Sequence, residues 1–257
     1  MSTTEWQTLE PHFHSGPGRR ARIGLLVLAT DLAVEPDLMR FTELDGVACY
    51  TSRMPMALTV NSGTLSALES EVVTATTNLV PWASFDAIAF CCTSGSIAVG
   101  AEKIREMVQS VKPGVPVCNP IDAALEALQR LDCHRVALMT PYVHEVNETL
   151  DDYFARRGLG VTRRAAFGQD GDPDINRITP ECLIAEAVKL GQGDCDSVFI
   201  SCTGMMTSSV VQHVEDQIGK PVVTSNQALA WSVLRAAGVA DAISGFGQLF
   251  QLDRSTG

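Results

Sequence analysis

Two stretches of this chain share one feature, an apolar run that ends in Cys-Thr. They are Asp86-Ala-Ile-Ala-Phe-Cys-Cys-Thr-Ser-Gly95 and Asp196-Ser-Val-Phe-Ile-Ser-Cys-Thr-Gly204. Short continuous apolar runs are typical of strands that are buried on both faces of a parallel sheet. We therefore predict that a strand ends and a helix begins at each cysteine, which puts Cys92 and Cys202 at matching places in two halves of the chain.

The segments around these cysteines repeat in the same order. Arg22, which opens an apolar run, lies 70 positions before Cys92, and Arg135 lies 67 positions before Cys202. Strands are predicted at residues 22–30, 47–53, 86–92, 116–119, 135–142, 160–167, 197–202 and 221–224. Helices are predicted from about residue 34 and over residues 66–79, 101–111, 121–131, 145–157, 180–190, 208–218 and 227–237. This duplication of alternating strands and helices predicts an α/β protein with a parallel sheet in each half.

We place an N-terminal domain at residues 1–120 plus 226–257 and a C-terminal domain at residues 121–225. Right-handed crossovers bring the carboxyl ends of the strands to one edge of each domain, and ligands of open parallel sheets bind there. If the two domains pack with pseudo-twofold symmetry, the site lies in the cleft between them. Cys92 and Cys202 then line its opposite walls.

The start of a helix favours an anion, because unpaired backbone N–H groups and the helix dipole meet there. A thiol in that position can have its pKa lowered from about 8.5 toward or below neutrality. We therefore predict that Cys92 and Cys202 are reactive thiols. The competing interpretation, an ordinary buried cysteine, is preferred for Cys49, Cys91, Cys118 and Cys182.

Composition excludes several classes of function. A formal net charge of −11 leaves no basic face for nucleic acid, and no apolar run approaches the ~18 residues of a membrane span. We expect neither partner and a cytoplasmic location, where thiols stay reduced. Eight cysteines without a C-x-x-C pair and five histidines without ligand spacing predict no metal site. Glycine-rich dinucleotide and nucleotide motifs are absent, so no cofactor is expected.

The predicted strand ends carry thiols, hydroxyls and amides, which suit acid/base or nucleophilic work on a small carboxylate. These residues are Thr30-Asp31, Cys92-Thr93-Ser94-Gly95, Asn119, Thr140-Pro-Tyr142 and Cys202-Thr203-Gly204. Two other interpretations stay open. Tyr142 suits a core aromatic equally well, and Thr93, Ser94 and Thr203 are also good helix N-caps.

Several of these motifs carry a resemblance that covers nearly the whole chain from about residue 20. The motifs are Cys92-Thr-Ser-Gly-Ser96, Gly100-Ala-Glu-Lys103, Thr140-Pro-Tyr142 and Cys202-Thr203. Together they resemble the maleate cis–trans isomerase and arylmalonate decarboxylase branch of the aspartate/glutamate racemase superfamily. The resemblance implies two Rossmann-like domains, no cofactor and a site in the interdomain cleft.

In the maleate isomerases the first cysteine adds to the double bond as a thiolate, and the second donates and accepts protons. Racemases of the superfamily use the two cysteines as opposed bases. The resemblance thus makes Cys92 the nucleophile or first base and Cys202 the second acid/base. It makes Tyr142 a hydrogen-bond donor to the substrate carboxylate. Thr93, Ser94 and the backbone of Thr203 and Gly204 would hold the carboxylate oxygens.

Two positions depart from the maleate isomerase pattern, where Asp31 and Pro173 stand in place of Asn residues. An ionised Asp31 repels a second substrate carboxylate but pairs with an ammonium or amide N–H group. The Leu28-Ala-Thr-Asp31 start also resembles the ectoine-utilisation protein A group, associated with an N-acetylated diamino acid.

We predict a two-cysteine isomerase or racemase of a small carboxylic acid, acting as a homo-oligomer. The alternatives are an arylmalonate-type decarboxylase, which needs only Cys202, and a non-enzymatic two-domain binding module.

Overall fold

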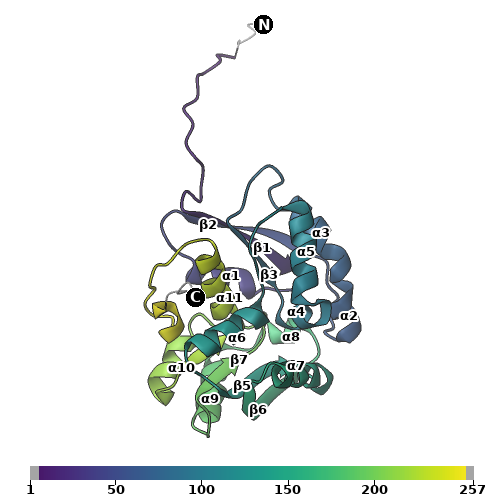
Figure 1. Cartoon of the computed structure of the whole chain (residues 1–257), viewed down its shortest axis with the longest axis vertical. Coiled ribbons are helices and arrows are strands. Elements are labelled where there is room, and N and C mark those ends of the chain that lie inside the picture. Colours follow the sequence, from purple (N-terminus) through teal and green to yellow (C-terminus); the bar gives the residue numbers. More distant parts are fainter. Residues whose placement is uncertain (1–5, 253–257) are drawn as a thin grey trace, which may run out of the picture.

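The computed structural model describes residues 6–252, which form two four-stranded sheets in which every strand pairing is parallel (Figure 1). The first sheet has the order β2-β1-β3-β4, and the second has the order β6-β5-β7-β8. Each sheet thus repeats the arrangement of the other. The predicted duplicated α/β architecture is confirmed.

The elements alternate along the chain as the duplication requires. The first sheet contains β1 (Ala21–Leu28), β2 (Val47–Met54), β3 (Ala87–Cys91) and β4 (Val117–Cys118). Its half of the chain contains helices α1 (Val34–Phe41), α2 (Ser62–Ala67), α3 (Glu69–Asn78), α4 (Thr93–Val99), α5 (Ala101–Val111) and α6 (Pro120–Arg130). The second sheet contains β5 (Arg135–Tyr142), β6 (Gly160–Gln169), β7 (Ser197–Ile200) and β8 (Val222–Thr224). The remaining helices are α7 (His144–Arg156), α8 (Asp172–Ile175), α9 (Pro180–Gly191), α10 (Val211–Ile218), α11 (Ser225–Ala236) and the 3-10 helix η1 (Gln248–Gln251).

Most predicted bounds are displaced by one or two residues, and the larger differences lie in the helices. The helix predicted over residues 66–79 begins at Ser62, because the Asn61 side chain accepts N–H bonds from the first turn, and it is divided at Leu68 into α2 and α3. The short helix α8 was not predicted. The helix predicted over residues 208–218 begins at Val211.

Helix α11 is buried from Ser225 to Arg235, and it contacts strands of both sheets as well as α1 and α6 (Figure 1). A helix that is buried all round carries either apolar side chains or polar side chains with hydrogen-bond partners in the interior. The polar residues of α11 have such partners. The domain boundary that we predict at residue 226 falls in the first turn of α11 and stays a prediction.

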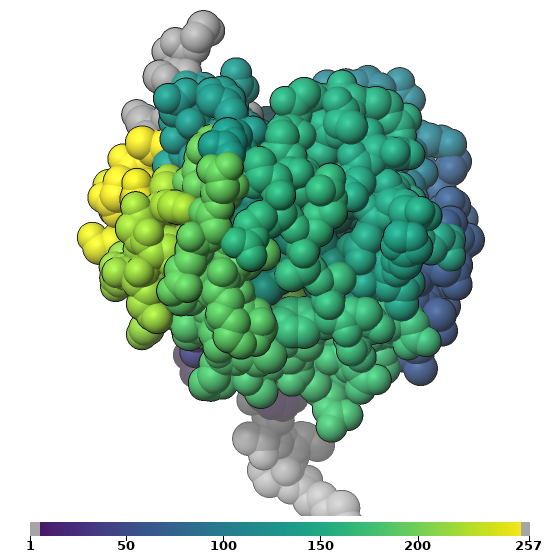
Figure 2. All heavy atoms as spheres, turned by 90° about the horizontal axis from the view of Figure 1, so that it is seen from below, coloured from purple at the N-terminus to yellow at the C-terminus, as the bar shows by residue number. Residues whose placement is uncertain are grey.

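Seen from below, the surface is formed mainly by the second sheet and its helices (Figure 2). Within residues 6–252, no helix is long and apolar enough to span a membrane.

The second half depends on an aromatic contact between α7 and β7. Phe154 is fully buried and meets the ring of Phe199 edge-on, with centroids 5.9 Å apart. Phe154→Ala is expected to lower the free energy of unfolding by about 3–5 kcal/mol, because it leaves a cavity. Phe13→Ala is the control: that ring is 91% exposed. Equal urea midpoints for the two variants would contradict this packing.

Candidate active site

Cys92 is the N-cap residue of α4, directly after β3, as predicted. Its Sγ accepts a hydrogen bond from the Gly95 N–H group at 3.2 Å. The Ser94 Oγ lies 3.9 Å from the same sulfur. Because only 4% of the residue is exposed, the thiol faces protein groups rather than bulk water.

Cys202 follows β7, but the prediction that a helix begins there is wrong. Turns occupy the segment after it, and α10 begins only at Val211. The φ angle of Cys202 is +152°, a conformation that L-residues rarely adopt and that clusters at functional sites. The Cys202 Sγ accepts an N–H bond from Gly204 at 3.3 Å. A local turn therefore supplies the donor that we expected from a helix.

Tyr142, at the end of β5, brings the two cysteines into one cluster. Its hydroxyl interacts with the Cys202 thiol and the Ser94 hydroxyl, and electrostatically with Cys92, strongly enough to shift its pKa. The ring is 2% exposed. Four predicted site residues, Cys92, Ser94, Tyr142 and Cys202, thus lie together, contributed by both sheets.

The two threonines that follow the cysteines bind protein groups. Thr93 Oγ1 donates a hydrogen bond to Ser225 Oγ at 2.9 Å. Ser225 Oγ also accepts the N–H of Cys202 at 3.0 Å. Thr203 Oγ1 donates to the carbonyl of Cys91 at 3.3 Å. Sequence reasoning missed Ser225, although its place directly after β8 was an available signal.

Two buried carboxylates lie beside this cluster. Asp31 Oδ1 accepts the N–H groups of Ala33 and Val34 at 2.7 and 2.8 Å. Asp172 accepts the hydroxyl of Thr30. Burial, opposed by the two N–H bonds, raises the pKa of Asp31 to about 6, and burial also raises the pKa of Asp172. Both carboxylates interact with Cys92 and Cys202.

Asp172 was not predicted, whereas Pro173 was expected to replace a site residue. Pro173 is exposed, whereas the neighbouring Asp172 is buried. Asn176 then fixes this segment against the first sheet, since its Oδ1 accepts the Leu32 N–H at 2.8 Å and its Nδ2 donates to the Asp172 carbonyl at 2.6 Å. The acidic part of the site is therefore held from both halves of the chain.

The predicted lowering of the thiol pKa values is wrong for this structure. Burial raises the pKa of Cys92 to about 12, and the Gly95 N–H bond opposes it only in part. Burial also raises the pKa of Cys202, against the interaction with Tyr142. The Tyr142 pKa lies well above its ordinary value, mainly because of burial. Desolvation of a charged sulfur outweighs a few N–H and O–H donors here.

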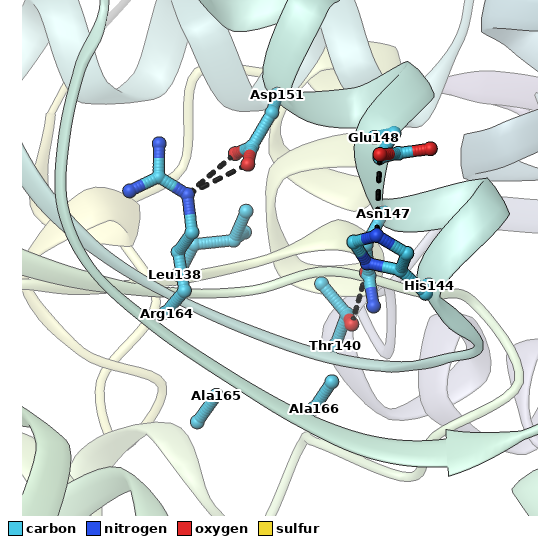
Figure 3. Close-up of a pocket in the computed structure, with 9 residues that line it drawn as sticks. All are labelled: Leu138, Thr140, His144, Asn147, Glu148, Asp151, Arg164, Ala165 and Ala166. Carbon is cyan, nitrogen blue, oxygen red and sulfur yellow. Dashed lines mark hydrogen bonds and ion pairs between the residues drawn. The ribbon is translucent and has the colours of Figure 1, made fainter.

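Two cavities lie near the elements that carry the cluster, and one of them is lined in part by a cluster residue. One of about 240 Å³ lies between α7 and strands β5 and β6, and Figure 3 shows Thr140 and Asn147 joined in its wall. Asn147 Nδ2 also donates to the carbonyl of Tyr142 at 2.9 Å, so this wall supports the Tyr142 backbone. The other cavity, of about 140 Å³, lies between α2, α4 and α7 and is lined in part by Ser94.

The raised pKa values predict slow alkylation. At pH 8 the exposed Cys182 should react with iodoacetamide at least 100-fold faster than Cys92. The Cys92 rate should rise about tenfold per pH unit up to pH 10, because only the thiolate reacts. Peptide mass spectrometry measures each rate. A Cys92 rate that levels off below pH 9 would show that burial does not control this thiol.

The family model described as arylmalonate decarboxylase matches residues 31–250. The arylmalonate decarboxylase of Bordetella bronchiseptica is 34% identical over 140 residues, which are 53% of this chain and 58% of that enzyme. The maleate isomerase of Nocardia farcinica is 26% identical over 243 residues, which are 90% of this chain and 96% of that enzyme.

Solved structures agree with these matches in fold. A Nocardia farcinica maleate cis–trans isomerase mutant with a covalently bound succinylcysteine intermediate superposes with a TM-score of 0.83 at 24% identity, over 90% of this chain and 98% of that one. An arylmalonate decarboxylase mutant in a sulfate-associated form gives a TM-score of 0.76 at 28% identity, over 90% and 100%. The chain belongs to the arylmalonate decarboxylase family, in the branch of the aspartate/glutamate racemase superfamily that also contains the maleate isomerases.

Proposed function

We propose that this protein is a cofactor-independent isomerase that uses Cys92 and Cys202 on a small carboxylic acid. The observation that carries the proposal is the cluster in which Tyr142 joins thiols from the two sheets. The maleate isomerases that align with nearly the whole chain support the same reaction class. In one of them, the succinylcysteine intermediate is a cysteine covalently joined to the substrate carbon skeleton.

Both forms of the reaction need one thiolate and one thiol. In racemisation, one sulfur removes the proton from the α-carbon and the other donates a proton to the opposite face. In cis–trans isomerisation, the Cys92 thiolate forms a C–S bond and the Cys202 thiol protonates the neighbouring carbon. After rotation about the C–C bond, Cys202 takes the proton back and the C–S bond breaks. Tyr142, Ser94, Thr93 and the N–H groups after Cys202 are the proposed ligands of the carboxylate.

The buried carboxylates favour one charge pattern in the substrate. An ionised Asp31 about 4–5 Å from a second substrate carboxylate repels it by about 3–4 kcal/mol at an effective dielectric near 20. An ammonium or amide N–H group on the substrate instead pairs with Asp31 or Asp172. Pairing also weakens the repulsion that raises the pKa values of the two thiols. We therefore favour an amino-acid derivative, such as the N-acetylated diamino acid of ectoine utilisation, over maleate.

Decarboxylation of an arylmalonate-type acid is the second candidate, because the Bordetella enzyme is 34% identical to this chain over 140 residues. That reaction needs one proton donor, whereas this site holds two thiols. We further propose that the protein is cytoplasmic, since a reducing compartment keeps both thiols free. We also propose that it forms a homo-oligomer.

Removal of either sulfur tests the mechanism. Cys92→Ser and Cys202→Ser should each lower turnover at least 10³-fold, because a serine hydroxyl is a far weaker acid and nucleophile. Proton NMR in D₂O follows the cis–trans conversion of maleate, exchange of the α-hydrogen of amino acids and N-acetyl diamino acids, and the decarboxylation of an arylmalonate. Cys182→Ser, at an exposed position, is the control. Full activity of either site variant removes the mechanism, and CO₂ release by Cys92→Ser identifies a decarboxylase.

The acidic residues should select the charge of the substrate. Asp31→Asn and Asp172→Asn are each expected to weaken binding of a cationic or N–H-bearing substrate by about 10²-fold and to strengthen binding of maleate. Because the Asp31 pKa is about 6, that carboxyl is ionised above pH 6, so binding of a cation should increase as pH rises through this value. Asp174→Asn is the control, because Asp174 is exposed and lies in α8, the helix that contains Asp172. Unchanged KM values in both site variants would contradict this role.

A further inference from the structure

Asp37 of α1 is a fully buried carboxylate that lies outside the thiol cluster. Its Oδ2 accepts hydrogen bonds from Thr207 N–H at 2.6 Å, Thr207 Oγ1 at 3.0 Å and Asn226 Nδ2 at 3.0 Å. Its Oδ1 accepts the Ser208 N–H at 3.1 Å. Burying a carboxylate is costly unless several donors replace water, and here four neutral donors converge on it.

These bonds cross from one half of the chain to the other. Asp37 belongs to the helix between β1 and β2, whereas Thr207 and Ser208 lie in the segment between β7 and α10. Asn226 belongs to α11, which packs beside α1 (Figure 1). One side chain of the first half therefore holds a loop of the second.

The segment that Asp37 holds, residues 203–208, begins directly after Cys202. Asn226 Nδ2, which bonds with Asp37, also donates to the carbonyls of Thr203 and Met205 in this segment, both at 3.0 Å. The same segment supplies the Gly204 N–H that donates to the Cys202 sulfur. The unusual φ of +152° at Cys202 persists only if its surroundings fix it. The loop has no helix at its start to do so, because α10 begins at Val211.

We propose that Asp37 is a positioning residue that fixes the 203–208 loop and thereby the direction and burial of the Cys202 thiol. The proposal rests on the proposed role of Cys202 in the reaction. Asp37 does not touch the thiols, so it acts through Thr207, Ser208 and Asn226. In Asp37→Asn, an amide NH₂ group replaces one acceptor oxygen and faces an N–H donor, so at least one bond to the loop is lost.

The test compares the alkylation rates of two cysteines in the same folded protein. In Asp37→Asn, the ratio of the Cys202 rate to the Cys92 rate should rise at least tenfold, because the loosened loop exposes Cys202 alone. With a substrate found in the NMR screen, kcat should fall at least tenfold, with KM within threefold of the parent value. A rate ratio within twofold of the parent overturns the proposal.

Glu215→Gln is the matched control, since Glu215 is also buried and also accepts backbone N–H bonds, from Val222 at 2.9 Å and Gln248 at 3.0 Å. It should lower the stability of the fold and leave the rate ratio unchanged. If Glu215→Gln raises the ratio as much as Asp37→Asn does, Asp37 has only a general structural role, and the proposal fails.

Thr207→Val is a milder variant that decides the question should Asp37→Asn not fold. It removes the hydroxyl that donates to Asp37 and keeps the shape and the backbone N–H. The rate ratio should rise three- to fivefold, and an unchanged ratio overturns the proposal. The alkylation ratio requires no turnover, so this test stands even if Cys202→Ser shows that the proposed reaction is wrong.

Discussion

The Ser225 hydroxyl links the two cysteine segments. It accepts one hydrogen bond from Thr93, next to Cys92, and another from the backbone N–H of Cys202. A second bond, from Thr203 to the carbonyl of Cys91, joins the same segments. Because all these groups are buried, each lost bond leaves an unsatisfied polar group in the interior. Thiols about 110 positions apart in the chain are thus held in one cluster.

Burial gives this cluster its chemical character. The sequence predicts that both cysteines lie near N–H donors that favour a thiolate. The structure has these donors, at Gly95 and Gly204. Desolvation outweighs them, and the carboxylates of Asp31 and Asp172 add repulsion. The free site therefore holds its thiols protonated. In the reaction that we propose, the substrate pairs with these carboxylates and removes part of the cost of a thiolate, so proton release is coupled to binding.

The fold was predictable because it depends on local patterns that occur twice. Apolar runs and matching intervals before Cys92 and Cys202 are visible in the sequence, and the duplicated parallel sheets follow from them. Contacts between distant segments were not predictable in the same way. Ser225, Asp172 and Asp37 each act on a partner more than 130 positions away, and no sequence period connects them. The family resemblance did predict Tyr142 as a site residue, because its Thr140-Pro-Tyr142 motif is local in the sequence.

The duplication makes the two cysteines equivalent in sequence, yet the structure makes them different. Cys92 caps a helix and receives one N–H bond, whereas Cys202 precedes a turn, receives one N–H bond and also interacts with the Tyr142 hydroxyl. The high pKa of Tyr142 keeps that hydroxyl a donor. If Tyr142 donates to a substrate carboxylate, as we propose, Cys202 loses an interaction that favours its thiolate and so holds its proton more firmly. In the mechanism that we propose, this difference favours Cys92 as the thiolate and Cys202 as the proton donor.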